Sequence, residues 1–309
     1  MVGAVCLAVL ASFLWAITNH IDKFLISGID EAGKSIKTLM VFSTLVAGVI
    51  LMPVWLIVSL VVGGGVTVSW FSLVMMLLSS IVNVLAIYFY FRALDQNDTS
   101  VVVIMFQMIP VFTYVLALIL FHETLTMSQL LGAAIIMSSA ILVSWDFETK
   151  GSNKNRTRAL IFMALSSLCY AGYYILFNAA TRESAYEACA FWYQIGLILV
   201  GLVLIGRKSY REQFVSAIKN NGKKYISLNV TNETVNLVAV FMVNYAATII
   251  PVALADILNG FQGAFVFILG VLGAKFLPKY FKENLSKKVV LQKVACIMLS
   301  IIGLVVMFV

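Results

Sequence analysis

Charged residues are scarce in this sequence: they make up 11% of its 309 positions, whereas hydrophobic residues make up 62%. Soluble proteins carry roughly 25% charged residues, so the scarcity excludes a soluble protein and indicates a polytopic membrane protein. A basic region before the first apolar run is also missing, and that run is too long for a cleaved signal peptide. We therefore expect the first apolar run to remain as a membrane helix.

Cysteine and histidine are rare as well, with four and two residues respectively. The cysteines lie inside apolar stretches without the spacing of metal ligands, which predicts neither a disulfide framework nor a zinc site. No group of histidines and cysteines, and no serine paired with a base, falls at one predicted membrane depth. We expect no enzymatic activity, no metal and no cofactor.

Ten apolar segments are each about as long as a membrane-spanning helix, which needs ~20 residues. They predict an all-α fold of ten transmembrane helices, and Pro110 is expected to bend the fourth. The segments cover residues 3–26, 38–62, 70–93, 100–121, 127–145, 159–180, 185–206, 225–247, 252–276 and 289–309.

Basic residues gather on alternate connections between these segments. If successive connections lie on opposite sides of a membrane, one side receives all of the 21 lysines and arginines except Arg182. Because short basic loops mark the cytoplasmic side, both termini are predicted to lie outside a cytoplasmic membrane. The net charge of +7 then reflects topology and attraction to anionic lipid. A nucleic-acid partner is not expected, since aromatic residues do not alternate with the basic ones.

A polar stretch near the middle of the chain, residues 146–158, is typical of a cytoplasmic linker. It divides the sequence into repeats at 1–145 and 159–309 with five segments each, and an odd number gives the second repeat the opposite orientation. Both repeats carry Glu-x-Leu-Ser/Thr before their last segment, beginning at Glu123 and Glu283. Thr126 and Gln129 form a predicted capping box there, which explains the motif locally; its recurrence indicates a duplication.

Three short motifs resemble a known family. They are Trp15-Ala16 in the first segment, Pro110 in the fourth, and the run His122–Gly132 that follows it. They resemble the EamA repeat of the drug/metabolite transporter superfamily, with one repeat in each half. The resemblance implies a secondary transporter with alternating access that moves a small metabolite, such as an amino acid, and export is the expected direction.

One stripe of polar residues interrupts the eighth apolar segment. Asn229, Asn232, Glu233 and Asn236 lie at i, i+3, i+4 and i+7, so a helix carries them on one face. A carboxylate at the bilayer centre costs ~2.5–3.5 kcal/mol on insertion scales and usually faces a cavity. We predict that the stripe lines the substrate cavity, where Glu233 exchanges protons or binds a substrate amine.

Other polar residues are predicted at the same depth: Asn83 in the third segment, Gln107 in the fourth and Gln262 in the ninth. Across the repeats the third segment corresponds to the eighth and the fourth to the ninth, which predicts a midplane site at the repeat interface. For each single amide the alternative is a hydrogen bond between helices, worth ~0.6 kcal/mol.

Aromatic residues offer a further cavity wall. Trp15 in the first segment, facing Tyr173 within an aromatic face of the sixth, forms a candidate surface for an aromatic or cationic substrate. Asn19, closer to the inner end of the first segment, is also expected to line the cavity. The alternative is ordinary packing, which is the commoner role of such stripes.

Both entrances of the cavity have candidate residues. Asp256 and Asn259 share a helix face near the outer surface and predict an outer vestibule. Lys23 and His20, at the inner end of the first segment, predict an inner gate or an anion contact. A salt-bridged cluster of His20 and Asp22 at the membrane surface explains that end equally well.

Two other functions remain open. A lipid-carrier or nucleotide-sugar translocase of the same superfamily would hold phosphate with inner basic residues, but few of these lie deep in the predicted bundle. A membrane scaffold would tolerate apolar replacement of the midplane amides. The stretch Gly28–Ser35 matches a phosphate-binding loop, but it connects two membrane segments without a preceding strand and does not predict nucleotide binding.

Overall fold

The structure, a computed structural model, describes residues 2–27, 36–62, 64–95, 97–121, 126–144, 154–247, 249, 258–276 and 285–308. Within these ranges every regular element is a helix, which confirms the all-α expectation. The helices are α1 Val2–Ser27, α2 Ile36–Val41, the π-helix η2 Phe42–Val46, α3 Ala47–Val61, α4 Trp70–Asp95, α5 Thr99–Met105, α6 Met108–Phe121, α7 Met127–Ser144, α8 Lys154–Thr181, α9 Tyr186–Gly206, α10 Lys208–Ala247, α12 Gln262–Phe276 and α13 Lys287–Phe308.

Six helical stretches are long and apolar enough to cross a membrane. Two further apolar helices, within α7 and α12, are shorter than such a span. Helix is present in each of the ten predicted segments, although part of the ninth, including Asp256, lies outside the described residues. The chain is therefore a multi-pass membrane protein, and the ten-span count stays a prediction.

Two of the predicted segments are not single helices. The fourth breaks at Phe106 and Gln107, because Pro110 has no N–H to bond the Phe106 carbonyl, which instead accepts from the Ile109 amide at 2.9 Å. The second contains the π-helix η2, where the buried Thr44 hydroxyl donates to the Met40 carbonyl at 2.6 Å. Hydroxyls that bond back to the preceding turn often bend helices.

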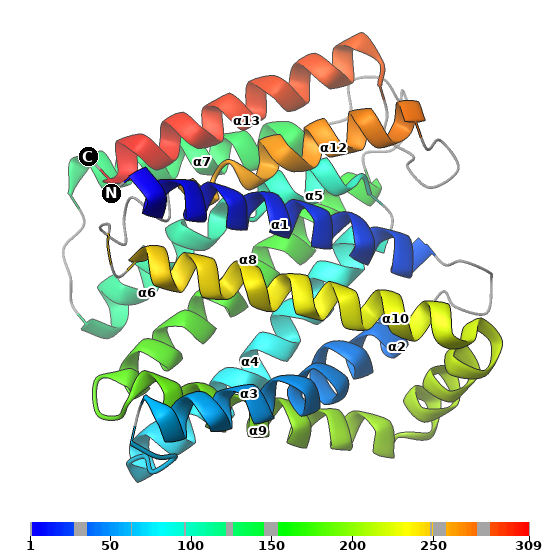
Figure 1. Cartoon of the computed structure of the whole chain (residues 1–309). Helices are drawn as coiled ribbons and strands as arrows, with labels where there is room; N and C mark the ends of the chain where they lie inside the picture. The colour runs from blue at the N-terminus through cyan, green and yellow to red at the C-terminus, as the bar shows by residue number, and fades with distance from the viewer. Residues whose placement is uncertain are drawn as a thin grey trace.

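Helix α10 begins outside the predicted eighth segment but changes direction at its boundary. Gly222 has a φ of 48°, in the left-handed region where glycine is favoured. The charged stretch from Lys208 is thereby turned away from the apolar stretch that carries Glu233, as the bend at the right of Figure 1 shows. The boundary predicted at residue 225 agrees with this turn.

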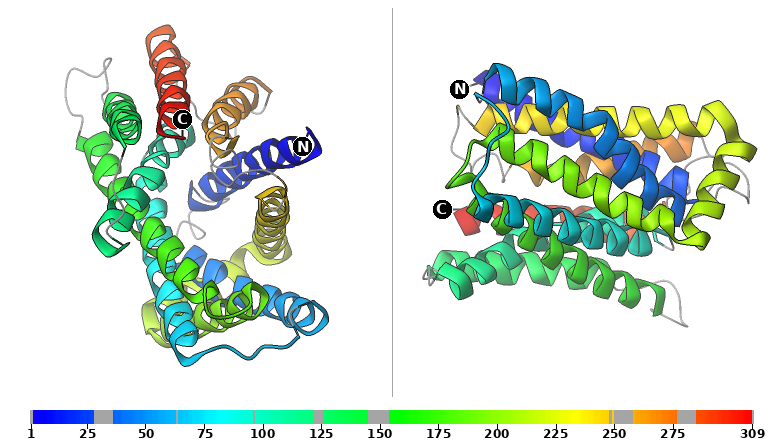
Figure 2. Two further views of the ribbon diagram at one scale, coloured as in Figure 1. Left: turned by 90° about the vertical axis from the view of Figure 1, so that its left-hand side faces the viewer. Right: turned by 90° about the horizontal axis from the view of Figure 1, so that it is seen from below.

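The helices run side by side across the molecule. α1 packs on α10 and α12, α4 on α8 and α9, and α7 on α13, so each half of the sequence contacts the other. The left view of Figure 2 looks obliquely along these helices, and the right view shows them lengthwise. The first residues of α1 and the last of α13 lie at the same end (Figure 1).

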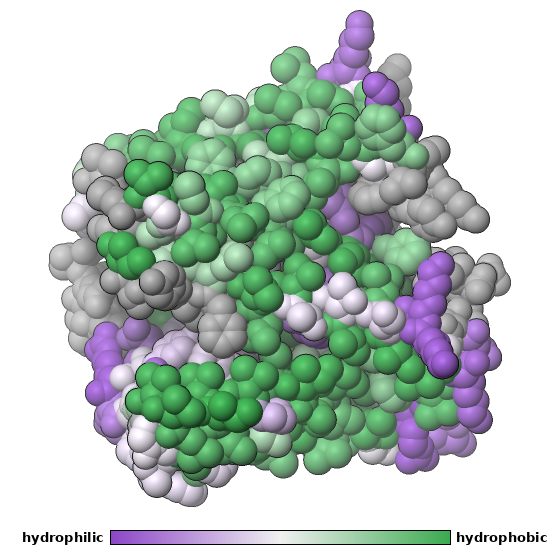
Figure 3. Space-filling model, in the orientation of Figure 1, coloured by the Kyte–Doolittle hydropathy of each residue, from purple (hydrophilic) through white to green (hydrophobic). Residues whose placement is uncertain are grey.

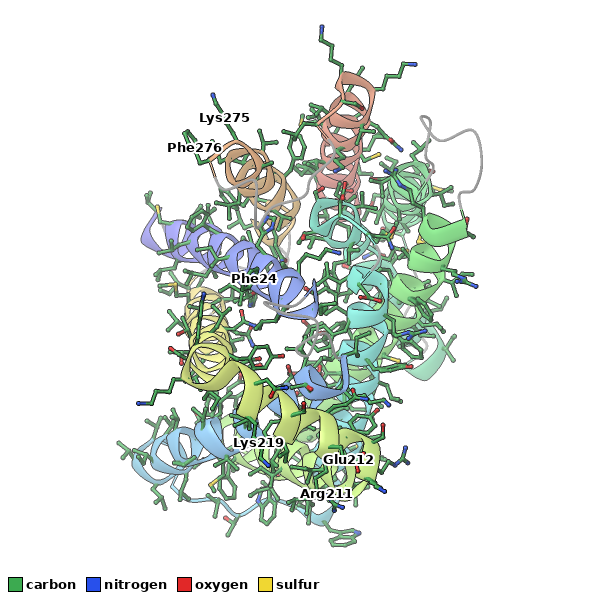
Figure 4. All side chains as sticks on the ribbon, turned by 90° about the vertical axis from the view of Figure 1, so that its right-hand side faces the viewer. Phe24, Arg211, Glu212, Lys219, Lys275 and Phe276 are labelled. Atoms are coloured by element: carbon green, nitrogen blue, oxygen red, sulfur yellow. The ribbon has the colours of Figure 1, made fainter. Side chains whose placement is uncertain are left out.

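Hydrophobic side chains cover most of the face in Figure 3, and the larger share of the hydrophilic ones lies at its right-hand end, with a smaller group at the lower left. The labelled side chains Arg211, Lys219 and Lys275 lie at the right-hand end (Figure 4). It is opposite the end that holds the outer residues of α1 and α13. This separation fits the charge pattern that predicts the cytoplasmic side.

The predicted capping box is present at the start of α7. The Thr126 amide donates to Gln129 Oε1 at 2.8 Å, and the Gln129 amide donates to Thr126 Oγ1 at 3.3 Å. Ser286 has the corresponding place before α13, where its hydroxyl accepts from the Val289 amide at 3.4 Å. The repeated motif therefore begins the last helix of each half in a similar way.

Glycine lets α9 approach the π-helix closely. A Cβ added at Gly201 would lie 2.7 Å from the backbone nitrogen of Leu45 and 2.8 Å from its Cα. Backbone atoms cannot turn aside as a side chain can, so the two helices would have to separate. The contact therefore fixes how closely α9 and η2 pack.

We expect Gly201→Ala to lower the melting temperature of the purified protein, at a cost of about 1–3 kcal/mol from overpacking. Gly206→Ala on the same helix is the control, since nothing lies within 4 Å of its added Cβ. Alanine favours helix over glycine by up to ~1 kcal/mol, so this control should melt unchanged or higher. Equal melting of both variants would show that the close approach is unimportant.

Candidate functional site

Asp22 lies within a hydrogen-bonded group at the contact of α1, α4 and α10. Asn232 Nδ2 donates to Asp22 Oδ1 at 2.8 Å. The Tyr90 hydroxyl lies 3.1 Å from Asp22 Oδ2 and 2.8 Å from Asn19 Oδ1. Because a hydroxyl has one proton, Tyr90 donates to one of these oxygens at a time. Among the described residues, the groups that donate to Asp22 are thus neutral.

Glu233 lies next to Asn232 on α10 and faces the π-helix. Its carboxylate accepts a hydrogen bond from the Ser43 hydroxyl in η2, and it interacts electrostatically with Asp22. The side chain is half-buried. π-Helical turns occur frequently at functional sites, and this one presents Ser43 to the carboxylate.

Neither carboxylate forms an ion pair with the basic residues that the structure describes. Lys23, the nearest basic residue in sequence to Asp22, donates to the carbonyls of Leu94 at 2.6 Å and Asp95 at 3.1 Å, at the end of α4. Lysines are favourable at helix C-termini. The described neighbours of the two acids therefore do not balance the negative charge that the pair carries when both are ionised.

Tyrosine rings form a wall beside the carboxylates. Tyr90, whose hydroxyl lies 3.1 Å from Asp22 Oδ2, packs its ring on Phe106 at 5.1 Å between centroids. Tyr170 on α8 and Tyr193 on α9 lie near the carboxylates. The ring centroids of Tyr173 and Tyr193 are 5.4 Å apart. The wall continues through Tyr174 and Phe177 on α8, and Phe106 packs on Tyr170 at 5.8 Å.

The predicted cavity residues are distributed over this region. Asn83 Nδ2 donates to the Tyr193 hydroxyl at 2.7 Å, and Trp15 Nε1 donates to Asn236 Oδ1 at 2.9 Å. Asn19 Nδ2 also donates to the Trp15 carbonyl at 2.6 Å. Side chains from both halves of the sequence thus meet, as the repeat-interface prediction requires.

Three of the predicted cavity residues, Asn229, Gln107 and Gln262, have other surroundings. Asn229 is buried and donates to the Tyr225 carbonyl of its own helix at 2.8 Å, so its amide stabilises α10 locally. Gln107 is buried at the break between α5 and α6. Gln262 begins α12, which packs against α5. These two glutamines therefore lie on neighbouring elements.

The residues predicted at the entrances are tied to neighbouring helices. His20 Nε2 lies 2.9 Å from the Val266 carbonyl of α12, and the Lys23 bonds to α4 fix the same end of α1. Asn259 Oδ1 lies 3.5 Å from the Ser12 hydroxyl. Asp256 lies outside the described residues. A surface hollow of about 410 Å³ at the start of α10 is separate from the carboxylates.

Sequence reasoning missed Asp22 as a cavity residue and did not single out Ser43, Tyr90 or Tyr193. Asp22 had a detectable signal: it follows Trp15 and Asn19 at i+7 and i+3, on one helix face. This is the same spacing that identified the stripe of α10. Ser43 had none, because its direction depends on the π-helical turn.

Comparisons with known proteins support the fold and the family. Residues 2–145 match the sequence model of the EamA-like transporter family. The curated proteins contain no match to the chain. Seventeen chains of solved structures match. One of them, titled "Crystal structure of protein", is 13% identical with a TM-score of 0.53, and the match covers 98% of this chain and 94% of that one. At this identity the likeness shows a shared fold.

Proposed function

We propose that this chain, which belongs to the EamA-like transporter family through residues 2–145, is a secondary transporter that works by alternating access. Its substrate is a small metabolite, moved across the cytoplasmic membrane, and export is the proposed direction. In this proposal ten spans form two inverted repeats, 1–145 and 159–309, joined by the linker 146–158. Both termini lie outside.

The observation that supports the proposal best is the meeting of Asp22 and Glu233. Asp22 and its neighbour Tyr90 belong to the first half of the chain, and Asn232 and Glu233 belong to the second. Substrate sites of such transporters lie at the interface of two repeats that move against each other. A rocking motion would change the bond between Asn232 and Asp22, and with it the environment of both carboxylates.

Glu233 is the proposed coupling residue. An ionised carboxylate inside the membrane is costly unless it gains a proton or a cation. Substrate and proton can therefore compete for Glu233 as the site opens to each side in turn. Its half-buried position is suitable for such exchange.

We expect Glu233→Gln to reduce substrate counterflow in proteoliposomes by at least tenfold and to flatten its dependence on pH, because glutamine cannot exchange a proton. Glu212→Gln is the matched control: Glu212 lies on the same helix in an exposed pair with Lys208, at 3.8 Å, and its loss should change neither property. Transport by Glu233→Gln with unchanged rate and pH dependence would disprove the coupling role.

A phosphate-binding translocase is less well supported. It requires basic groups at the substrate site, whereas the described partners of Asp22 and Glu233 are hydroxyls, an amide and each other. Lys23, the candidate anion contact, instead donates to two helix-terminal carbonyls.

A further inference from the structure

We infer that Asp22 and Glu233 together bind an organic ammonium ion, a substrate class that excludes zwitterionic amino acids and anions. The inference rests on the proposed transport function and makes it more specific. It also makes Asp22 a second binding residue, on the opposite half of the chain from Glu233.

The charge of the site is the first step. The 2.8 Å bond from Asn232 to Asp22 brings the part of α10 that carries Glu233 against Asp22 on α1, so the two carboxylates lie near each other. No described basic residue forms an ion pair with either of them. Buried charges in proteins are normally paired, because an unpaired one loses its hydration without compensation. A cation between the two acids would supply the missing charge.

Free acceptor capacity is the second step. A carboxylate offers about four lone-pair sites, and the two acids accept bonds from Asn232, Tyr90 and Ser43. These donors hold each carboxylate in a fixed orientation without neutralising it. The remaining sites can accept from the N–H groups of an ammonium ion.

The aromatic wall is the third step, and it selects an organic cation. The Tyr90 hydroxyl lies 3.1 Å from Asp22 Oδ2, and the Tyr90 ring packs on Phe106, which packs on Tyr170. The rings of Tyr173 and Tyr193 pack on each other nearby. Aromatic faces attract ammonium groups and cover the hydrocarbon attached to them. Metal ions such as Ca²⁺ require six to eight oxygen ligands. Within the described residues no group of three or more histidines, cysteines and acids is placed to hold a metal.

Four phenylalkyl compounds of similar size test the inference, because they differ mainly in charge: phenethylamine, phenethyl alcohol, phenylalanine and phenylacetate. Each is added to the purified full chain, and the melting temperature and the bound fraction in equilibrium dialysis are measured. A ligand that binds only the folded protein raises its melting temperature. We expect phenethylamine to bind and the alcohol, zwitterion and anion to bind at least tenfold more weakly.

Variants link the binding to the two acids. Asp22→Asn and Glu233→Gln should each weaken phenethylamine binding by tenfold or more, and Glu212→Gln should leave it unchanged. Retained amine binding in both site variants would overturn the inference, as would equal or tighter binding of phenylalanine or phenylacetate. Absence of binding by all four compounds would also overturn it and would assign the acids to protons alone.

Counterflow in proteoliposomes separates this inference from the proposed function. If phenylalanine is transported and phenethylamine is neither bound nor transported, the transporter assignment stands and the ammonium site is wrong. If phenethylamine binds through both acids but none of the four compounds crosses the membrane, the ammonium site stands and the transport assignment fails.

Discussion

Replacing Asp98 by asparagine should destabilise the protein by about 3 kcal/mol. Asp98 Oδ2 lies 2.7 Å from Lys293 Nζ, and the lysine side chain is only 1% exposed. Breaking a buried ion pair by removing one partner typically costs ~3–5 kcal/mol, because the other charge stays buried without its counter-ion. We expect the low end of this range, since the new amide oxygen can still accept a hydrogen bond.

The reverse substitution, Lys293→Met, should cost less. The Asp98 side chain is 21% exposed, so water can hydrate its carboxylate when the ammonium is gone. Loss of a helix cap does not complicate the comparison, because Asp98 precedes α5 without a side-chain capping bond. Thermal and denaturant unfolding of both variants in the same detergent measures the difference. Equal destabilisation, or a smaller effect of Asp98→Asn, would contradict this account.

The ion pair belongs to a polar seam between the halves. Asp98 lies in the first half and Lys293 in the second, and the Ser139 and Ser300 hydroxyls lie 2.8 Å apart between α7 and α13. Gln292 Nε2 also donates to the Leu142 carbonyl at 2.6 Å. These bonds tie the last helix of each half together.

Much of the fold could be predicted from composition and periodicity. Long apolar runs require helices in lipid, because every backbone N–H and C=O must be bonded within the segment. The capping box of Thr126 and Gln129 could also be predicted, because its bonds join residues that are close in sequence. The π-helix at Ser43 was not predicted; its Leu45 packs closely against Gly201, far away in the sequence.

The candidate site was only partly predictable. Helical spacing gave the face shared by Asn232 and Glu233, but it could not show that Asn229 bonds its own helix. For the inner end of the first segment, a salt-bridged cluster of His20 and Asp22 was one of two predicted explanations, whereas the structure directs Lys23 to α4 and Asp22 to Asn232. Non-local partners decide the direction of each side chain, and spacing along one helix does not contain them.

Lys293 shows the same limit for topology. The charge pattern counted it with the basic residues of the cytoplasmic side, where a lysine normally extends its ammonium to water. The structure buries it against Asp98 instead. The pair joins residues 195 positions apart, so neither local charge nor hydropathy indicates it.

The same acid-to-amide change should have the opposite effect on stability at the candidate site. We expect Asp22→Asn and Glu233→Gln each to stabilise the ligand-free protein, by roughly 0.5–2 kcal/mol. Such gains are typical when a functional group that destabilises the fold is removed. Neither acid has a described basic partner, so neutralising one removes its repulsion with the other and the cost of its burial. The amides can still accept from Asn232 and Ser43.

Melting curves of both variants beside Asp98→Asn test this contrast directly, because the chemical change is the same at all three positions. The gain at Asp22 and Glu233 should be larger in alkaline than in acidic buffer, since deprotonation charges the pair. It should also disappear when a bound ammonium ion stabilises the unsubstituted protein but not the variants. Destabilisation by both site variants would mean that the two carboxylates maintain the fold. The distinction in role between these acids and Asp98 would then be wrong.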